Sequence, residues 1–537
     1  MGYSLKQAST LIIDDFQSMR TMLREFVKNM GVVNIDTASN GKDALNQLSN
    51  NKYDIVICDY NLGTGPNGQQ VLEDAKLRSL IGVSTIWVMV TAEKTSDMVM
   101  GAAEVKPDDY LLKPINQVTL QARLEKLMAR KQSLGPVEAA IRASDFAVAI
   151  GHCDELLKSQ VLNPQEVLRI KSDLLLTLGD YAAARTLFEA VLAQRQVAWA
   201  STGLAKVLFF GKSYADAIAL LTRVLADNPM YVEAADWLAK CYEACGDAAQ
   251  AQEVLQHAVK LSPNSPVRQK KLGDVAYRNG VLDVAQSAFE KTIRISEFSP
   301  HKSAAVYARL ADVFSDKGES QEALNVLKRT RSEFRFNSAA SLQTATAEAR
   351  VYHKMGKADL SQASLATAES LMAQMEGKLT AEQLMDVAQS HLQLGHQDKA
   401  CKILADIVKN NHEDTDISAQ IEHIFAKADL KSVGQALINA SRQEVVDINN
   451  QGVVLAKKGD YQQGAGLLRS AIKQLPGSEV MIVNLAGLLI AQMSKDGYKD
   501  VLAAEARELL ERVHGLNPAN KKYYSYTLVL TRLQRNR

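Results

Sequence analysis

Five polar residues, each at the end of a short apolar run, carry the chemistry that this sequence suggests. They are Asp14, Asp15, Asp59, Thr91 and Lys113. Clustered carboxylates repel one another, so we expect a hard divalent cation among them, and Mg²⁺ prefers oxygen ligands shared with phosphate and water. The predicted ligands are Asp14, Asp15, Asp59 and the backbone carbonyl of Asn61.

These groups suit the transfer of a phosphoryl group onto a carboxylate. A bound cation would orient the phosphoryl group for attack by an oxygen of Asp59, which forms an acyl phosphate. The Lys113 ammonium and the Thr91 hydroxyl would hold the other phosphoryl oxygens, and the small Ala92 leaves room for them. Positioning and charge stabilisation supply most of the catalysis in phosphoryl transfer. A lone acid after an apolar run more often opens a turn, so the prediction requires all five residues to meet.

Alternating strands and helices over the first 130 residues would bring them together. The predicted strands, each a short apolar or alternating run, span residues 10–13, 33–38, 54–59, 84–90 and 110–112. Apolar residues at helical spacing follow every strand, including a helix that runs from Met98 to Val105. Five such units predict a parallel sheet with helices on both faces. Ligand sites in such sheets lie at the carboxyl ends of the strands, where the five residues are expected.

Residues 8–130 resemble the receiver domain of two-component response regulators, close to the chemotaxis regulator type. The matching runs are Ile12–Arg20, Asn40–Leu45, Cys58–Asn61, Val90–Ala92 and Tyr110–Pro114. This resemblance implies an α/β domain of the flavodoxin-like class with five parallel strands. The implied roles are Asp59 as phosphoacceptor, Asp14 and Asp15 as metal ligands, Thr91 and Lys113 as groups that sense the phosphoryl group, and Tyr110 as an aromatic switch beside Thr91.

Two further features follow from the resemblance. The Lys113–Pro114 bond is a candidate cis peptide. The glycine-rich segment from Leu62 to Gly68 is one residue longer than the usual loop, and this length is expected to affect metal access or the lifetime of the acyl phosphate. The alternative is a receiver that keeps its fold but never accepts phosphate.

Beyond Ser133–Pro136, which breaks the last receiver helix, the sequence predicts only helices. Its small residues recur with a fixed period, because Ala217, Ala251 and Ala285 are 34 residues apart. That period, with its glycine turns and closing prolines, resembles the tetratricopeptide repeat (TPR). We therefore predict a receiver domain over residues 1–132 and an all-α TPR solenoid over residues 133–537. The solenoid would have about nine or ten units, a degenerate unit near Ala428–Asp429 and a C-terminal capping helix.

Composition excludes several other classes of function. With 62 basic and 61 acidic side chains the net charge is +1, so no electrostatic footprint for nucleic acid is present. No apolar run is long enough to span a membrane and no signal peptide is present, so a cytoplasmic location without membrane insertion is expected. The five cysteines and nine histidines are scattered and are interpreted as surface or packing residues. Trp199 and Trp237 are likewise interpreted as core residues.

The leading hypothesis is therefore a response regulator that acts as a signalling adaptor. A histidine kinase or phosphotransfer protein would phosphorylate Asp59, and the TPR domain would bind protein partners that are not yet identified. The face of the receiver that carries Met98, Met100 and Tyr110 is expected to change its contacts. No enzymatic activity is expected beyond Mg²⁺-dependent self-phosphorylation and dephosphorylation. The order of domains resembles TPR response regulators of the VieB type.

Two alternatives remain open. In the first, the receiver drains phosphate from a histidine kinase or competes for it, and the solenoid only localises the protein. In the second, the solenoid is a scaffold that works without phosphorylation, and the receiver serves for docking or for forming a homodimer. A DNA-binding regulator is a distant third, because the charge is balanced and no recognition helix is evident.

Overall fold

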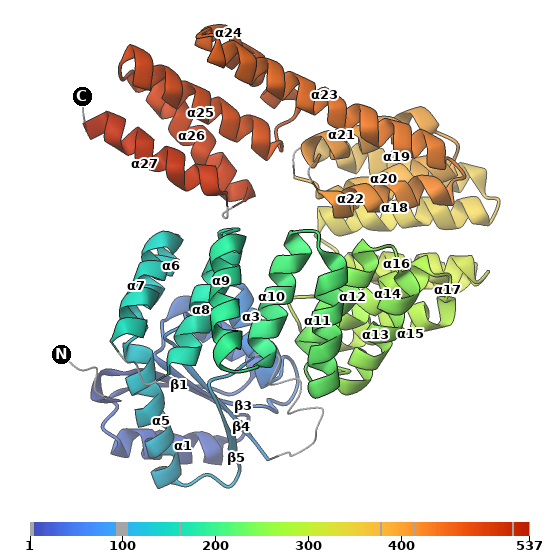
Figure 1. The fold of residues 1–537 in the computed structure, drawn as a ribbon. Helices are drawn as coiled ribbons and strands as arrows, with labels where there is room; N and C mark the ends of the chain where they lie inside the picture. The colour runs from blue at the N-terminus through green and yellow to red at the C-terminus, as the bar shows by residue number, and fades with distance from the viewer. Residues whose placement is uncertain are drawn as a thin grey trace. The chain divides into compact units, whose positions relative to one another are not determined.

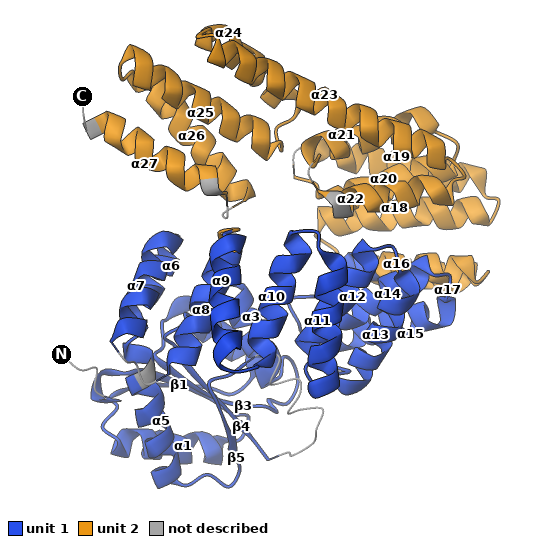
Figure 2. Cartoon of the chain, viewed as in Figure 1, with its two compact units in different colours: residues 1–176, 180–306 blue, residues 177–179, 307–537 orange. Residues whose placement is uncertain are grey.

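The computed structural model describes residues 5–92, 106–159, 163–375, 378–412, 414–517 and 520–535 (Figure 1). The helix predicted from Met98 to Val105 lies outside these residues. The chain divides into two compact units (Figure 2). Unit 1 contains residues 1–176 and 180–306, and unit 2 contains residues 177–179 and 307–537. Unit 1 therefore joins the N-terminal α/β domain to the first helices of the repeat region.

The N-terminal domain is built on a five-stranded parallel sheet. Its strands are β1 (Ser9–Ile13), β2 (Asn34–Ala38), β3 (Ile55–Asp59), β4 (Ile86–Thr91) and β5 (Asp109–Leu112). The strand order is β2-β1-β3-β4-β5, and every described pair is parallel, which confirms the predicted flavodoxin-like class. Strand β4 begins at Ile86 instead of Ser84, because the amide of Thr85 donates to the carbonyl of Gly82 and closes a turn there.

Helices cover both faces of the sheet and form two apolar cores. The helices are α1 (Gln17–Asn29), α2 (Gly41–Asn50), α3 (Gly68–Leu77) and α5 (Gln117–Gln132), preceded by a 3₁₀ turn at Leu5–Gln7. Helices α1 and α5 pack on one face, against side chains such as Ile12, Ile57 and Val88. Helices α2 and α3 pack on the other face, against Val56 and Trp87. Alternate side chains of each strand thus serve opposite cores, as the pleat requires.

The described residues after the sheet domain are helical. In unit 1 the helices are α6 (Gly135–Arg142), α7 (Phe146–Lys158), α8 (Pro164–Thr177), α9 (Tyr181–Gln194), α10 (Ala198–Phe210), α11 (Tyr214–Asp227), α12 (Val232–Ala244), α13 (Ala248–Leu261), α14 (Pro266–Arg278) and α15 (Leu282–Ile295). Helix α16 (Ala304–Asp316) crosses the division between the units. The remaining helices are α17 (Ser320–Glu333), α18 (Ser338–Lys354), α19 (Ala358–Gln374), α20 (Ala381–Gln393), α21 (Gln397–Asn410), α22 (Thr415–Lys427), α23 (Lys431–Lys457), α24 (Tyr461–Gln474), α25 (Glu479–Asp496), α26 (Asp500–Leu516) and α27 (Lys521–Arg535). None of the helices that the structure describes is long and apolar enough to cross a membrane.

The turns inside the helical pairs explain the recurring glycines of the sequence. Gly395 and Gly459 have φ values of 81° and 88°, a left-handed conformation that costs glycine little. At the degenerate unit, Asp429 takes the same conformation with φ of 56°. Aspartate tolerates this region better than most residues, which explains how the turn persists without glycine.

A second use of glycine is close packing between neighbouring helices. A Cβ added to Gly203 of α10 would lie 2.2 Å from Cζ of Phe188, a fully buried side chain of α9. Two helices can approach this closely only when one contributes no side chain.

We therefore expect Gly203→Ala to destabilise unit 1 by about 1–3 kcal/mol, because the phenyl ring must leave its packed position. The matched control is Gly151→Ala in α7, where an added Cβ meets nothing within 4 Å. That control should stabilise the protein by about 0.5–1 kcal/mol, since alanine suits a helix better than glycine. Hydrogen exchange of α7, α9 and α10 measures both changes, and equal exchange in the two variants would contradict the packing argument.

Candidate functional site

The five residues singled out in the sequence meet at the carboxyl edge of the sheet. Asp14 follows β1, Asp59 ends β3, Thr91 ends β4 and Lys113 follows β5. Parallel pairing places these ends side by side, with Asp59 opposite Val90 in the register of β3 and β4. The site is also largely shielded from water, because Asp14 is 1% exposed and Asp59 is 6% exposed.

Lys113 joins the two most buried carboxylates of the site. Its Nζ lies 2.8 Å from Oδ2 of Asp59 and 3.0 Å from Oδ2 of Asp14. Burial alone would lower the pKa of Lys113, but the hydrogen bonds to Asp59 and Asp14 outweigh it, so the pKa is raised. The ammonium therefore stays charged between two acids. From this position it can pair with the negative charge of a phosphoryl group on Asp59.

At Asp59, the effect of burial on the pKa outweighs the effect of the neighbouring cation. Burial raises its pKa, and the negative charge of Asp14 raises it further, while Lys113 acts to lower it. A carboxylate with a raised pKa is more basic than an ordinary aspartate and lacks a full shell of water. Both properties favour nucleophilic attack when a cation offsets the charge around it.

Asp14, Asp15 and Asp59 form an acidic cluster that fits a divalent cation. One ligand oxygen from each residue lies within 4.8 Å of the others. Oδ1 of Asp15 is buried and has no hydrogen-bond partner in the described residues. A buried carboxylate oxygen without a partner is costly, and a cation held by oxygen ligands would satisfy it. The donor set therefore suits Mg²⁺.

The remaining site residues surround this cluster. The Asn61 carbonyl belongs to the loop directly after β3. The amide of Lys113 donates to the carbonyl of Thr91 over 2.8 Å, which ties the end of β5 to the end of β4. The hydroxyl of Tyr110 on β5 is buried without a hydrogen-bond partner among the described residues. Burial also raises the pKa of Tyr110. The Lys113–Pro114 peptide is cis, as predicted.

The glycine-rich loop after Asp59 is ordered by contacts to the strand. Gly63 and Gly65 have φ values of 69° and 116°, which non-glycine residues rarely adopt. The amide of Gly68 donates to the carbonyl of Tyr60 over 2.8 Å. A Cβ added to Gly68 would lie 2.1 Å from the backbone oxygen of Asp59. Helix α3 therefore begins in direct contact with the backbone of the predicted phosphoacceptor.

Sequence reasoning gave no role to Arg20, which supports the acidic cluster from outside. Its Nη1 donates to the carbonyl of Asp14 over 2.6 Å and to the carbonyl of Asp15 over 3.1 Å. Arg20 lies at the end of one of the runs that matched receiver domains, so its position was the available signal. Its contacts go to the backbone, which the side-chain pattern of the sequence does not reveal.

This fold and this site are similar to those of receiver domains. The family model described as "Response regulator receiver domain" matches residues 10–125. Two models described as "Tetratricopeptide repeat" match residues 137–200 and 211–272. The chain thus has a response regulator receiver domain, followed by a long all-helical region that contains tetratricopeptide repeats.

Individual relatives resemble the N-terminal domain. The chemotaxis protein CheY-3 of Vibrio cholerae serotype O1 is 29% identical over 125 residues, which cover 23% of this chain and 95% of the relative. The chemotaxis protein CheY of Pseudomonas aeruginosa is 29% identical over 120 residues, 22% of this chain and 95% of the relative. A solved structure of V. cholerae CheY4 is 26% identical, covers 22% of this chain and 98% of its own, and has a TM-score of 0.21.

Proposed function

We propose that this protein is a response regulator that accepts a phosphoryl group on Asp59 and signals through protein binding by its TPR domain. The observation that carries the proposal is the arrangement of Asp59, in contact with Lys113 and grouped with Asp14 and Asp15 at the carboxyl edge of the sheet. The donor would be a histidine kinase or a phosphotransfer protein. This arrangement supports a receiver that accepts phosphate over one that keeps only the fold.

The residues of the site divide the work of the transfer. When bound by Asp14, Asp15, Asp59 and the Asn61 carbonyl, Mg²⁺ would offset the charge of the incoming phosphoryl group. Oδ1 or Oδ2 of Asp59 attacks phosphorus, and the bond to the donor breaks, leaving an acyl phosphate. Lys113 is already charged and within reach, so it pairs with a phosphoryl oxygen without gaining a proton. Thr91 holds a second oxygen through its hydroxyl.

Removal of one carboxylate from the cluster should weaken Mg²⁺ binding. We expect Asp15→Asn to lower the affinity for Mg²⁺ by about tenfold or more, because a charged ligand is lost from the site. Asp109→Asn is the matched control, since this aspartate lies at the opposite end of β5 and pairs with Arg123. Isothermal titration calorimetry of the full chain measures both. Equal affinities of the two variants would refute the proposed metal site.

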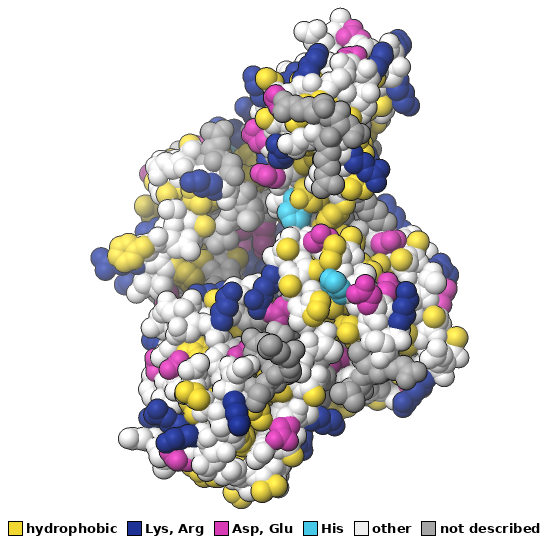
Figure 3. Space-filling model, turned by 90° about the vertical axis from the view of Figure 1, so that its left-hand side faces the viewer, with side chains coloured by type: hydrophobic (Ala, Val, Ile, Leu, Met, Phe, Trp, Pro, Cys, Tyr) yellow, Lys and Arg dark blue, Asp and Glu magenta, His cyan; other side chains and the backbone are white. Residues whose placement is uncertain are grey.

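The output would be protein binding by the helical region. On the face drawn in Figure 3, Lys and Arg side chains are interspersed with Asp and Glu side chains. Such a surface suits protein partners better than nucleic acid, which needs a concentrated basic patch. The domain order, which resembles regulators of the VieB type, favours action on another two-component pathway in the cytoplasm.

Two variants, each expressed in the host cell, distinguish the adaptor hypothesis from its alternatives. A chain that ends at residue 132 should lose the pathway output, whereas a phosphate sink or kinase competitor would keep it. Asp59→Asn should change the output as well, whereas a phosphorylation-independent scaffold would keep it. Unchanged output in either variant would exclude the adaptor.

A further inference from the structure

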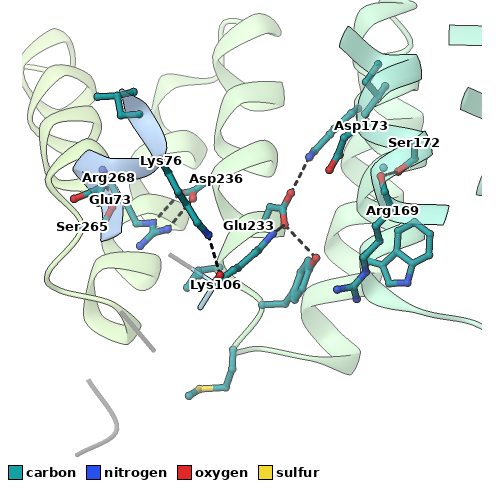
Figure 4. Close-up of a pocket in the computed structure, with 18 of the residues that line it drawn as sticks. Glu73, Lys76, Lys106, Arg169, Ser172, Asp173, Glu233, Asp236, Ser265 and Arg268 are labelled. Atoms are coloured by element: carbon teal, nitrogen blue, oxygen red, sulfur yellow. Dashed lines mark hydrogen bonds and ion pairs between the residues drawn. The ribbon is translucent and has the colours of Figure 1, made fainter. Parts of the chain in front are cut away.

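Receiver helix α3 lies against the first helices of four successive helical pairs in unit 1. Its Gln69, Glu73, Lys76 and Leu77 share the lining of one cavity with side chains of α8, α10, α12 and α14 (Figure 4). The cavity has a volume of about 780 Å³. We call the repeat side of it the inner wall, and its main members are Arg169, Trp199, Lys206, Glu233 and Arg268.

The amino end of α3 is fastened to the repeats through Gln70. Its side-chain Oε1 accepts from the amide of Asn67 over 3.0 Å, and its backbone amide donates to the side chain of Asn67 over 2.9 Å. This reciprocal pair caps α3. The Nε2 of the same side chain donates to the carbonyl of Ile295, the last residue of α15, over 3.1 Å. One amide group thus joins the cap of α3 to the end of a repeat helix.

The middle of α3 is held by contacts of Glu73 with a histidine and a serine. Oε1 of Glu73 lies 3.2 Å from Nε2 of His301, and the hydroxyl of Ser299 donates to Oε2 of Glu73 over 3.4 Å. The hydrogen bond to Glu73 raises the pKa of His301. His301 and Ser299 both lie in the segment between α15 and α16. This segment therefore places two hydrogen-bonding side chains against the acid on α3.

The carboxyl end of α3 reaches the inner wall through Lys106. Nζ of Lys76 donates to the backbone carbonyl of Lys106 over 2.8 Å. Nζ of Lys106 in turn lies 3.7 Å from Glu233 on α12, which also pairs with Lys206 over 2.7 Å. Figure 4 shows Lys106 pointing toward this glutamate and Lys76 pointing toward the backbone of Lys106. The contacts thus extend along the length of α3, through an amide at Gln70, an acid at Glu73 and an ammonium at Lys76.

Helix α3 also contacts the backbone of the phosphoacceptor. Its first residue, Gly68, packs on the backbone oxygen of Asp59 so closely that no side chain would fit. Its cap, Asn67, ends the glycine-rich loop that begins beside Asp59. A displacement of the β3 carboxyl end is therefore passed to the cap of α3, and the cap shares Gln70 with the repeats.

We propose that α3 is a resident occupant of the inner wall, and that phosphorylation of Asp59 releases it so that a partner helix can take its place. This inference deepens the proposed function, on which its release step rests. The site fits a helix with an acid directed toward His301 and a base directed toward Glu233, which is the helix-in-groove mode of recognition. The receiver thus controls the repeats by covering the surface that binds the partner.

Hydrogen exchange of the full chain tests both steps. The first comparison sets Glu73→Lys against Glu125→Lys, an exposed acid on α5. The Glu73 variant removes the carboxylate that contacts His301 and Ser299, so exchange of residues 296–301 should rise by about threefold or more, while the Glu125 variant stays at the wild-type rate. The double variant Glu73→Lys with His301→Glu reverses the pair and should restore protection. Equal exchange in all four proteins would overturn the docking.

The second comparison adds Mg²⁺ and beryllium trifluoride, a mimic of the phosphoryl group. Exchange of residues 68–77 and 296–301 should rise in the wild type and stay unchanged in Asp59→Asn. If residues 59–66 become protected by the mimic but the two segments keep their slow exchange, the phosphoacceptor site is real and the release is wrong. If residues 59–66 show no response, the proposed function itself fails and the release fails with it.

Discussion

Asp59→Asn is expected to abolish phosphoryl incorporation when the full chain is incubated with Mg²⁺ and acetyl phosphate. An asparagine amide has nearly the shape of the carboxylate but is not a nucleophile, so no acyl phosphate can form. Asp14 is not expected to replace it, because its carboxylate is only 1% exposed and already accepts from the amide of Phe16 over 2.9 Å. Intact-mass spectrometry measures the loss.

Two further variants serve as controls for this result. Asp109→Asn removes an aspartate from the amino end of β5 and should incorporate phosphate like the wild type. Lys113→Met keeps the nucleophile but removes the cation beside it, so it should retain some incorporation. Phosphate on Asp59→Asn at the wild-type level would place the phosphoacceptor elsewhere and contradict the assignment.

Arg350→Met should destabilise unit 2 by about 3–5 kcal/mol, the largest effect expected of any single change to the repeats. Arg350 is 3% exposed. Its guanidinium forms two parallel hydrogen bonds with Asp312, of 2.9 and 2.7 Å, and another to the Ser390 hydroxyl over 3.0 Å. Burial alone would lower the pKa of Arg350, but the charges of Asp312 and Asp386 outweigh it and keep it raised. Its removal leaves the buried carboxylate of Asp312 without its nearest cation, since Arg309 lies 3.9 Å away.

A second variant tests whether the large effect of this substitution comes from the buried, unpaired carboxylate of Asp312. Asp312→Asn combined with Arg350→Met removes the buried charge, so it should recover part of the lost stability. Arg507→Met on α26 is the control, since Arg507 is exposed and its replacement should cost less than about 0.5 kcal/mol. Because a chain of several units need not unfold in one step, hydrogen exchange of α18 is the suitable measurement. Exchange of α18 as slow as in the wild type would contradict the role of Arg350.

The receiver fold and the phosphoacceptor site were predictable because their signals are local. Each strand is a short apolar run, and the residue that follows it must lie at the carboxyl edge once the strands are parallel. The five polar residues at strand ends could therefore be grouped from their positions alone. The start of β4 was placed two residues too early, because the turn closed by Thr85 is made by backbone groups that any sequence could supply.

The contacts of α3 could not be predicted, because they depend on how two domains fold against each other. Gln70 and Ile295 are 225 positions apart, and no periodicity connects them. His301 was interpreted as a surface or packing residue for the same reason. Trp199 was interpreted as a core residue. It does pack edge-on against Phe188, but it is only partly buried and lines the cavity beneath Arg169.

The buried charges of unit 2 could be predicted only in part from the sequence. Asp312, Arg350 and Asp386 occupy the first helices of successive pairs. Asp312 and Arg350 each precede the glycine of their pair by six residues, so an alignment of the repeats would have placed them at equivalent positions, whereas Asp386 lies about one helical turn earlier in its own helix. Sequence alone could not show that they are buried, because the side chains that cover them come from several helices.

The central claim is that the charge state of Asp59 decides what the repeats bind. It is tested most directly by affinity capture with the full chain as bait, comparing the wild type and Asp59→Asn with and without Mg²⁺ and beryllium trifluoride. The account predicts partners that the wild type retains several-fold more strongly with the mimic, and that Asp59→Asn retains equally in both conditions. The same partners held equally by both proteins in both conditions would contradict it.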